Sequence, residues 1–439
     1  MRRLLLACVL TATLTAAASA DNWPQWRGPK NDGHSAEKNL PTEWGAEVKY
    51  VEKDVNGKKQ KVADGFVGTP KNVVWACPLP GRGSSTPAIW GDRIFLTAQD
   101  KKDVFLICVG TDGKEKWKKQ IATSQKESYR GSEGDDASAS CTTDGKHVWT
   151  FVGTGDLLCH DVDGKEVWRE DLQKYGKFGI QFGCHWTPVV FGDHVYLQVM
   201  HRNAQLVVAL KKDTGKQVWK VERKGYSKGE SPDTYASAFV WEGDGGPLLI
   251  AHGNDYCTAH KLEDGAEVWR VNGLNPTNNG AWRFVSSPLV TPTLIVVPSC
   301  KNGPTVALNP VGAKGTIDED NKAELWRFKS TPDVVSPILV DGIVYLLRDG
   351  PLTAVDAKTG AQIYQADVAK QIHRGHMVAA DGKIYTIGRE GACDVVQAGK
   401  EFKKLATNTL PDTFYASPAI ADGRIYLRGW GHLWAIGTK

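Results

Sequence analysis

The sequence is poor in methionine and, beyond its N-terminus, has no long apolar run. It holds 3 methionines among 439 residues, against 46 glycines and 16 tryptophans. A helix that spans a bilayer needs about 20 consecutive apolar residues, and no segment after residue 20 supplies them. The composition therefore favours a β-rich chain that carries no membrane span.

A predominance of one charge sign is also missing. The chain has 54 lysines and arginines against 50 aspartates and glutamates, which leaves a net charge of +4. Binding to nucleic acid or to a membrane surface depends on a strongly basic surface. We therefore expect no nucleic-acid partner.

Short metal and haem motifs are absent as well. After Cys8 the eight cysteines are widely spaced, with no C-x-x-C, no C-x-x-C-H and no adjacent pair, and the histidines show no H-x-x-x-H or H-E-x-x-H spacing. These are the spacings that zinc sites and c-type haem sites use. We predict no metal site, and we expect most of the cysteines to be buried free thiols.

The N-terminus has the pattern of a signal peptide. Arg2 and Arg3 precede an apolar run from Leu4 to Leu14, and small residues follow at Ala18-Ser19-Ala20. A charged start, a short apolar core and an A-x-A end are typical of a secretory signal that is cleaved after export. We predict a signal peptide over residues 1–20 and an exported protein, periplasmic or extracellular.

Two phrases recur along the rest of the chain. The first is an apolar run, a Gly-Asp or Asp-Gly pair and an alternating apolar run, as in residues 88–96, 189–197 and 419–427. The second is a glycine-containing turn followed a few residues later by an aromatic side chain. Both patterns predict β-hairpins. The aromatic positions of the second phrase are Trp117, Trp168, Trp219, Trp269, Trp326 and Tyr364.

Two hairpins in succession make a four-stranded antiparallel sheet, which is one blade of a β-propeller. From Trp117 to Phe402 the aromatic spacings are 51, 51, 50, 57, 38 and 38 residues, close to the ~40–45 residues of known blade repeats. The C-terminal unit, residues 415–439, lacks its last strand, and residues 72–79 around Trp75 can supply it. We predict an all-β, eight-bladed propeller over residues 72–439, with its last blade closed by this N-terminal strand.

Two further expectations follow from this organisation. The seven aromatic residues, with Trp75 as the first, are predicted to dock between neighbouring blades and to bury large apolar areas there. Residues 21–71 are predicted to form an N-terminal arm over the propeller, with an extra hairpin at Val48–Val62 around Asn56-Gly57.

The repeat resembles a known family. A Thr-Gly turn followed by an aromatic residue, as at Thr359-Gly360, is similar to the tryptophan-docking motif of propellers that bind pyrroloquinoline quinone (PQQ). The opening phrase Trp-Pro-Gln-Trp-Arg-Gly-Pro at residues 23–29 resembles that of exported PQQ-like propellers of planctomycete-type bacteria. The resemblance covers residues 21–439. It implies kinship both with quinoprotein dehydrogenases and with the non-enzymatic propeller lipoprotein of outer-membrane protein assembly, and one fold can host such unrelated functions.

Candidate binding residues were placed by aligning the first hairpins of the blades on their turns. The loops that lead into the innermost strands meet at one mouth of the central channel, and loops on a rigid scaffold commonly carry function. The candidate ligand-binding residues at this channel mouth are Arg82, His185, Asp233, Tyr235, Arg283, Arg374 and Tyr415.

Two functions remain open from the sequence. The first is a monomeric binding or scaffolding propeller that recognises a protein, peptide or glycan partner in the cell envelope, without cofactor or catalytic residues. The alternative is a PQQ- and calcium-dependent oxidoreductase acting on an alcohol or sugar. That reaction needs six to eight oxygen ligands for Ca²⁺, a carboxylate base, a cation and an aromatic floor. Asp233 could be the base, Arg283 or Arg374 the cation, and Trp186 or Trp282 the floor, but no calcium-ligand motif is recognisable.

Overall fold

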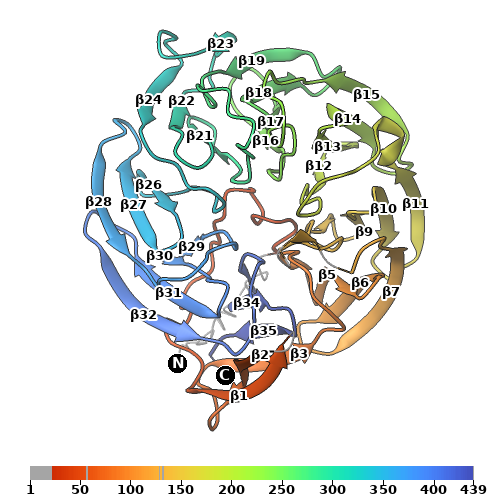
Figure 1. Cartoon of the computed structure of the whole chain (residues 1–439), viewed down its shortest axis with the longest axis vertical. Helices are drawn as coiled ribbons and strands as arrows, with labels where there is room; N and C mark the ends of the chain where they lie inside the picture. The colour runs from red at the N-terminus through yellow and green to blue at the C-terminus, as the bar shows by residue number, and fades with distance from the viewer. Residues whose placement is uncertain (1–21, 56–57, 128, 131–132, 439) are drawn as a thin grey trace, which may run out of the picture.

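The computed structural model describes residues 22–55, 58–127, 129–130 and 133–438. Eight β-sheets stand around a central axis, and a separate two-stranded sheet lies beside the ring (Figure 1). The fold is an eight-bladed β-propeller, as predicted. The predicted signal peptide lies outside the described residues.

The first four blades follow one another along the chain, each from its innermost to its outermost strand. Blade 1 has β4 (Ala88–Trp90), β5 (Arg93–Asp100), β6 (Asp103–Gly110) and β7 (Glu115–Thr123). Blade 2 has β8 (Thr142–Thr143), β9 (His147–Phe151), β10 (Asp156–Asp161) and β11 (Glu166–Asp171), followed by the short 3₁₀ helix η2 (Leu172–Tyr175). Blade 3 has β12 (Val189–Phe191), β13 (His194–His201), β14 (Ala204–Lys211) and β15 (Gln217–Glu222). Blade 4 has β16 (Phe239–Trp241), β17 (Leu248–Gly253), β18 (Tyr256–Lys261) and β19 (Glu267–Val271).

The remaining blades continue the circle. Blade 5 has β20 (Leu289–Val290), β21 (Ile295–Pro298), β22 (Thr305–Leu308) and β24 (Glu324–Phe328). Blade 6 has β25 (Ile338–Val340), β26 (Ile343–Leu347), β27 (Pro351–Asp356) and β28 (Gln362–Asp367). Blade 7 has β29 (Val378–Ala380), β30 (Lys383–Tyr385), β31 (Ala392–Gln397) and β32 (Lys403–Thr409). Blade 8 has β33 (Ala419–Ala421), β34 (Arg424–Arg428) and β35 (His432–Ile436) from the C-terminus, and β3 (Val73–Pro78) as its outer strand.

The closure of the last blade is confirmed. Strand β3 pairs antiparallel with β35, with Ala76 opposite Trp434 and Cys77 opposite Leu433. The first and the last strand of the propeller therefore belong to one sheet, and the outer edge of β35 is covered.

One blade departs from the predicted four strands. The connection between β22 and β24 contains β23 (Gly315–Ile317), which pairs in parallel with β19 and makes blade 4 a five-stranded sheet. The long spacing of 57 residues before Trp326 is the sequence sign of this insertion.

Five of the tryptophans make the same contact with the next blade. Their indole Nε1 donates a hydrogen bond to a backbone oxygen at the turn between the third and fourth strands of that blade, at 2.7–3.0 Å. The pairs are Trp75 to Thr111, Trp117 to Val162, Trp168 to Lys212, Trp219 to Leu262 and Trp326 to Ala357. A glycine with positive φ lies over each indole. At Gly215 (φ +69°) an added Cβ would lie 2.7 Å from the ring of Trp168.

The two other aromatic residues are placed differently. Trp269 is buried, but its Nε1 has no hydrogen-bond partner in the described part of the chain. At Gly312, the glycine of the next blade's turn, the space around a Cβ is empty. Strand β23 lies along β19 beside Trp269 and interrupts the repeated contact. Tyr364 packs edge-on against Phe402, with ring centroids 5.9 Å apart.

The N-terminal arm crosses the propeller. Trp23 exchanges two backbone hydrogen bonds with Ile89 of blade 1, and Ser35 donates to the backbone oxygen of Ala379 in blade 7. Figure 1 shows this red segment running across the centre of the ring. A hairpin of β1 (Val48–Val55) and β2 (Lys58–Phe66) follows the arm.

The eight described cysteines are buried and free, as expected. In the part of the chain that the structure covers, we find no helix with the length and apolarity needed to cross a bilayer.

Candidate functional site

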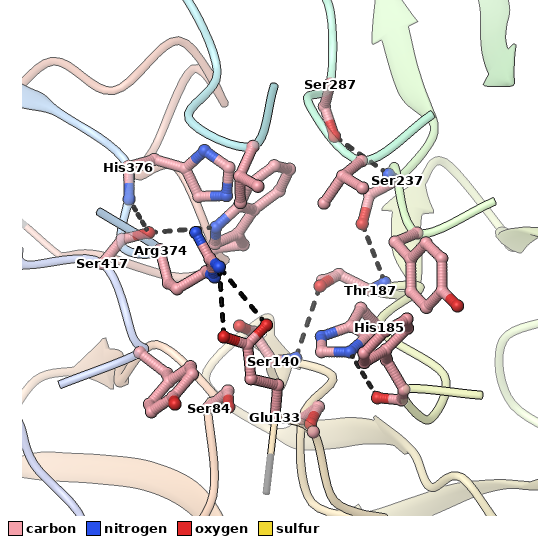
Figure 2. Close-up of a pocket in the computed structure, with 18 of the residues that line it drawn as sticks. Ser84, Glu133, Ser140, His185, Thr187, Ser237, Ser287, Arg374, His376 and Ser417 are labelled. Carbon is pink, nitrogen blue, oxygen red and sulfur yellow. Dashed lines mark hydrogen bonds and ion pairs between the residues drawn. The ribbon is translucent and has the colours of Figure 1, made fainter. Parts of the chain in front are cut away.

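A closed ring of hydrogen bonds lines the central channel. In every blade, one residue near the start of the inner strand donates its backbone N–H to the side chain of the equivalent residue in the next blade. Figure 2 shows part of this ring, from Ser140 to Ser287 and from His376 to Ser417. The eight donor–acceptor distances range from 2.6 to 3.3 Å. Around the ring, the residues are Thr86, Ser140, Thr187, Ser237, Ser287, Ser336, His376 and Ser417.

His376 takes the place that hydroxyl side chains hold in the other seven blades. Its Nδ1 accepts the N–H of Ser336 at 2.6 Å, so Nδ1 carries no proton in this arrangement. Burial lowers the pKa of His376 well below its ordinary value, and the charge of Arg27 acts in the same direction. The ring therefore contains a neutral imidazole.

The arm closes one end of the channel with Trp26. The indole Nε1 points at Oγ of Ser417, 3.4 Å away, and the ring meets the imidazole of His376 edge-on at 4.7 Å. The neighbouring Arg27 is buried and donates to the backbone oxygen of Pro337 at 2.7 Å. The repeat pattern indicated an arm over the propeller but gave no sign that Trp26 enters the channel.

A cavity of about 190 Å³ lies above this floor, at the end of the channel where loops lead into the inner strands. We call this end the mouth. Five of the seven candidate binding residues line it: His185, Tyr235, Arg283, Arg374 and Tyr415. Their role in binding stays a prediction.

The two other candidates point elsewhere. Asp233 is buried behind the mouth, and its carboxylate accepts from Arg202 at 2.5 Å. Arg82 donates to the backbone oxygen of Glu127, and its guanidinium lies over the ring of Trp430. The alignment of hairpins correctly places both residues in loops that lead into inner strands. It cannot show that an ion pair holds the side chain of Asp233, or ring stacking that of Arg82, outside the cavity.

The charges at the mouth pair with one another. Glu133 faces Arg374, whose Nη2 lies 3.1 and 3.3 Å from the two carboxylate oxygens, and Arg389 lies 3.6 Å from the same carboxylate. On the other side, Arg283 pairs with Glu230 at 2.7 Å. The hairpin repeat does not indicate that Glu133 forms an ion pair across the mouth.

Aromatic rings flank both ion pairs. Tyr415 stacks on Trp430 with an interplanar angle of 3° and a centroid distance of 5.2 Å. Opposite them, Tyr235 meets Phe182 and His185 edge-on, and the guanidinium of Arg283 lies 4.9 Å from the centre of Phe182. Burial lowers the pKa of His185. The mouth thus combines paired charges with aromatic rings.

Comparison with known proteins assigns the fold to a family. The family profile of the outer membrane protein assembly factor BamB matches residues 111–286 and 203–439. The chain belongs to the BamB family. The match spans most of the propeller.

Solved structures share the BamB-family fold at low sequence identity. BamB from Moraxella catarrhalis is 14% identical, with a TM-score of 0.59, over 83% of this chain and 99% of that one. Quinohemoprotein alcohol dehydrogenase from Comamonas testosteroni is 12% identical, with a TM-score of 0.65, over 95% and 81%. A europium-containing methanol dehydrogenase is 10% identical, with a TM-score of 0.65, over 94% and 90%. No curated protein sequence matches the chain.

The carboxylates that line the mouth are engaged by other groups of the protein. Among the described residues, no group of three or more histidine, cysteine, aspartate or glutamate side chains could hold a metal ion. Asp333, at the rim, accepts from the backbone of Lys301, and Glu133 is paired with arginine. The cavity of about 190 Å³ is below the ~300 Å³ at which pockets for drug-sized ligands begin.

Neither Trp186 nor Trp282, the aromatic residues expected beneath a quinone, lines the cavity. Trp186 is fully buried, and its Nε1 donates to the backbone oxygen of Thr234. Trp26 of the arm lines the cavity instead.

Proposed function

We propose that this BamB-family protein is an exported binding propeller that recognises a polypeptide partner of the cell envelope at its mouth. The observation that carries the proposal is the pairing of the mouth's own charges, Glu133 with Arg374 and Glu230 with Arg283, beside half-buried aromatic rings. Such groups suit recognition of a protein surface, where aromatic and arginine side chains supply most of the binding energy. The family of outer membrane protein assembly factor BamB supports the choice of a protein as the partner.

The structure of the channel favours binding at the mouth over transport of a molecule through the ring. Trp26 lines the bottom of the cavity. The eight ring residues donate and accept hydrogen bonds among themselves. A partner therefore meets a shallow site rather than an open pore, and contacts with the loops around the mouth must provide the rest of the interface.

The proposal is tested by native co-purification from the envelope fraction of the producing cells. Val334 lines the mouth, so Val334→Arg should remove the co-purifying polypeptide by filling the cavity. Val167 lies at an exposed outer strand, and Val167→Arg serves as the matched control that keeps the polypeptide. Equal recovery with both variants would place the partner elsewhere and contradict the proposal.

The alternative function makes a separate demand. A quinoprotein oxidoreductase should bind PQQ when Ca²⁺ is added, shift the quinone absorbance and reduce a dye with an alcohol or sugar. We expect no shift at high micromolar PQQ. A saturable shift followed by turnover would favour the oxidoreductase.

A further inference from the structure

The carboxylate of Glu133 reaches across the mouth. Its residue leads into blade 2, while Arg374 and Arg389 belong to blade 7, and Arg374 is 241 positions away in the chain. Figure 2 shows Glu133 extending toward the guanidinium of Arg374 inside the cavity. A carboxylate from one side of the mouth thus fills a site built by two arginines on the other.

The geometry of this ion pair leaves it open to exchange. Both carboxylate oxygens share Nη2 of Arg374, while Nη1 donates to the backbone oxygen of His373. The strongest arginine–carboxylate pairs use two parallel N–H groups. The side chains of Arg374 and Glu133 are 21% and 28% exposed, so solvent weakens their attraction. A carboxylate that reached the arginines from above could replace Glu133.

The other acidic groups near the arginines do not fill this site. Asp349 lies 3.7 Å from Nη1 of Arg374 and is 53% exposed, and Glu390 lies 3.8 Å from Arg389 and is 71% exposed. Of these carboxylates, Glu133 is among the residues that line the cavity. Asp349 and Glu390 remain solvated at its rim.

An aromatic surface adjoins the arginines. The ring of Tyr415 lines the cavity and stacks in parallel on Trp430. Arginine pairs with carboxylates, and an aromatic ring packs against the apolar groups beside them. The combination suits an acidic residue within a polypeptide.

We propose that Arg374, Arg389 and Tyr415 form a recognition site for a carboxylate of a partner polypeptide, and that Glu133 occupies it in the free protein. The inference rests on the proposed function and names the chemical group that the mouth selects. The carboxylate comes from an acidic side chain or from a chain end, which the test separates.

The test measures binding of three labelled peptides by fluorescence anisotropy. The probes are acetyl-Ala-Tyr-Glu-Tyr-Ala-amide, acetyl-Ala-Tyr-Gln-Tyr-Ala with a free C-terminus, and acetyl-Ala-Tyr-Gln-Tyr-Ala-amide. We expect one of the first two to bind and the third to fail. If Glu133 fills the site nine-tenths of the time, Glu133→Gln tightens binding about tenfold. Arg374→Gln abolishes it, and Arg389→Gln does the same if the Arg374 variant fails to fold.

The matched control is Glu267→Gln, which breaks an ion pair with Arg270 on strand β19, away from the mouth, and leaves peptide affinity unchanged. Equal affinity of Glu133→Gln and wild type, or peptide binding that survives both arginine substitutions, would overturn the inference. If Val334→Arg removes the co-purifying partner while the arginine variants retain it, the proposed function stands and the carboxylate site falls.

Discussion

The backbone N–H of Ser417 donates to Oγ1 of Thr86, 3.2 Å away and 331 residues earlier in the chain. This bond joins blade 8 to blade 1 and completes the ring of eight hydrogen bonds in the channel. Two closures therefore hold the propeller together, one in the outer strand β3 and one at the axis. Thr86 and Ser417 are both buried, so a lost acceptor there is not replaced by bulk water.

Thr86→Val is expected to lower the free energy of unfolding by about 1–3 kcal/mol, because it leaves the N–H of Ser417 buried without an acceptor. Urea titration measures the change. The control is Thr214→Val, since Thr214 makes its hydrogen bond in an exposed turn, and it should stay within about 0.5 kcal/mol of wild type. Equal losses for the two variants would show that the axial closure contributes nothing.

Gly215→Ala should destabilise the protein more than Gly312→Ala. Both glycines have positive φ, +69° and +73°, so both variants bear the same backbone strain. The added methyl group at residue 215 meets the ring of Trp168 at 2.7 Å, and the one at residue 312 meets nothing within 4 Å. The overpacking predicts an extra loss of about 1–3 kcal/mol for Gly215→Ala in urea titration. A smaller loss at residue 215 than at residue 312 would contradict the contact.

Trp219→Ala removes an indole that is 8% exposed and that bonds to Leu262 of the next blade. Large aromatic-to-alanine changes in a core cost about 3–5 kcal/mol, and we expect a loss of that size. Trp219→Phe keeps most of the apolar area but loses the hydrogen bond, so it should cost less. A loss below about 1 kcal/mol for Trp219→Ala would show that this residue does not stabilise the blade interface.

His201 makes stability fall as the pH is lowered. Burial lowers its pKa from 6.5 to about 4, and its Nδ1 accepts from the N–H of Asn203. Below pH 6.5 the unfolded chain binds a proton at this residue and the folded chain does not. Stability therefore declines by about 1.4 kcal/mol per pH unit from pH 6.5 down to about 4.

The contribution of His201 is isolated by comparison with His201→Gln. In urea titrations at several pH values, the unfolding free energy of the variant should fall less steeply between pH 6.5 and 4. The difference in slope should correspond to the uptake of about one proton on unfolding. Parallel pH profiles of the two proteins would rule out this assignment.

The fold could be predicted because its signals are local and repeated. Glycine turns and aromatic positions mark each hairpin, and the missing strand after residue 437 matched the surplus strand around Trp75. The fifth strand of blade 4 could not be predicted, since the parallel pairing of β23 with β19 depends on where a neighbouring blade places its long connection.

The location of the mouth was predicted in outline, and its role in binding stays a prediction. Alignment of the hairpins located the mouth and residues such as His185. The direction in which a side chain points depends on its partners from other blades, as the ion pair with Arg202 shows for Asp233. A signal for the ring was present in the sequence, because a serine or threonine recurs near the start of the inner strand in seven of the eight blades.

The claim that the mouth binds a polypeptide is tested most directly by site-specific photo-crosslinking in the producing cells. A photoreactive amino acid at residue 334, in the mouth, should yield one discrete protein adduct. The same group at residue 90, exposed at the end of β4 on the arm side, should yield none. An adduct from residue 90 alone, or no adduct from residue 334 in a protein that oxidises an alcohol with PQQ and Ca²⁺, would contradict the account.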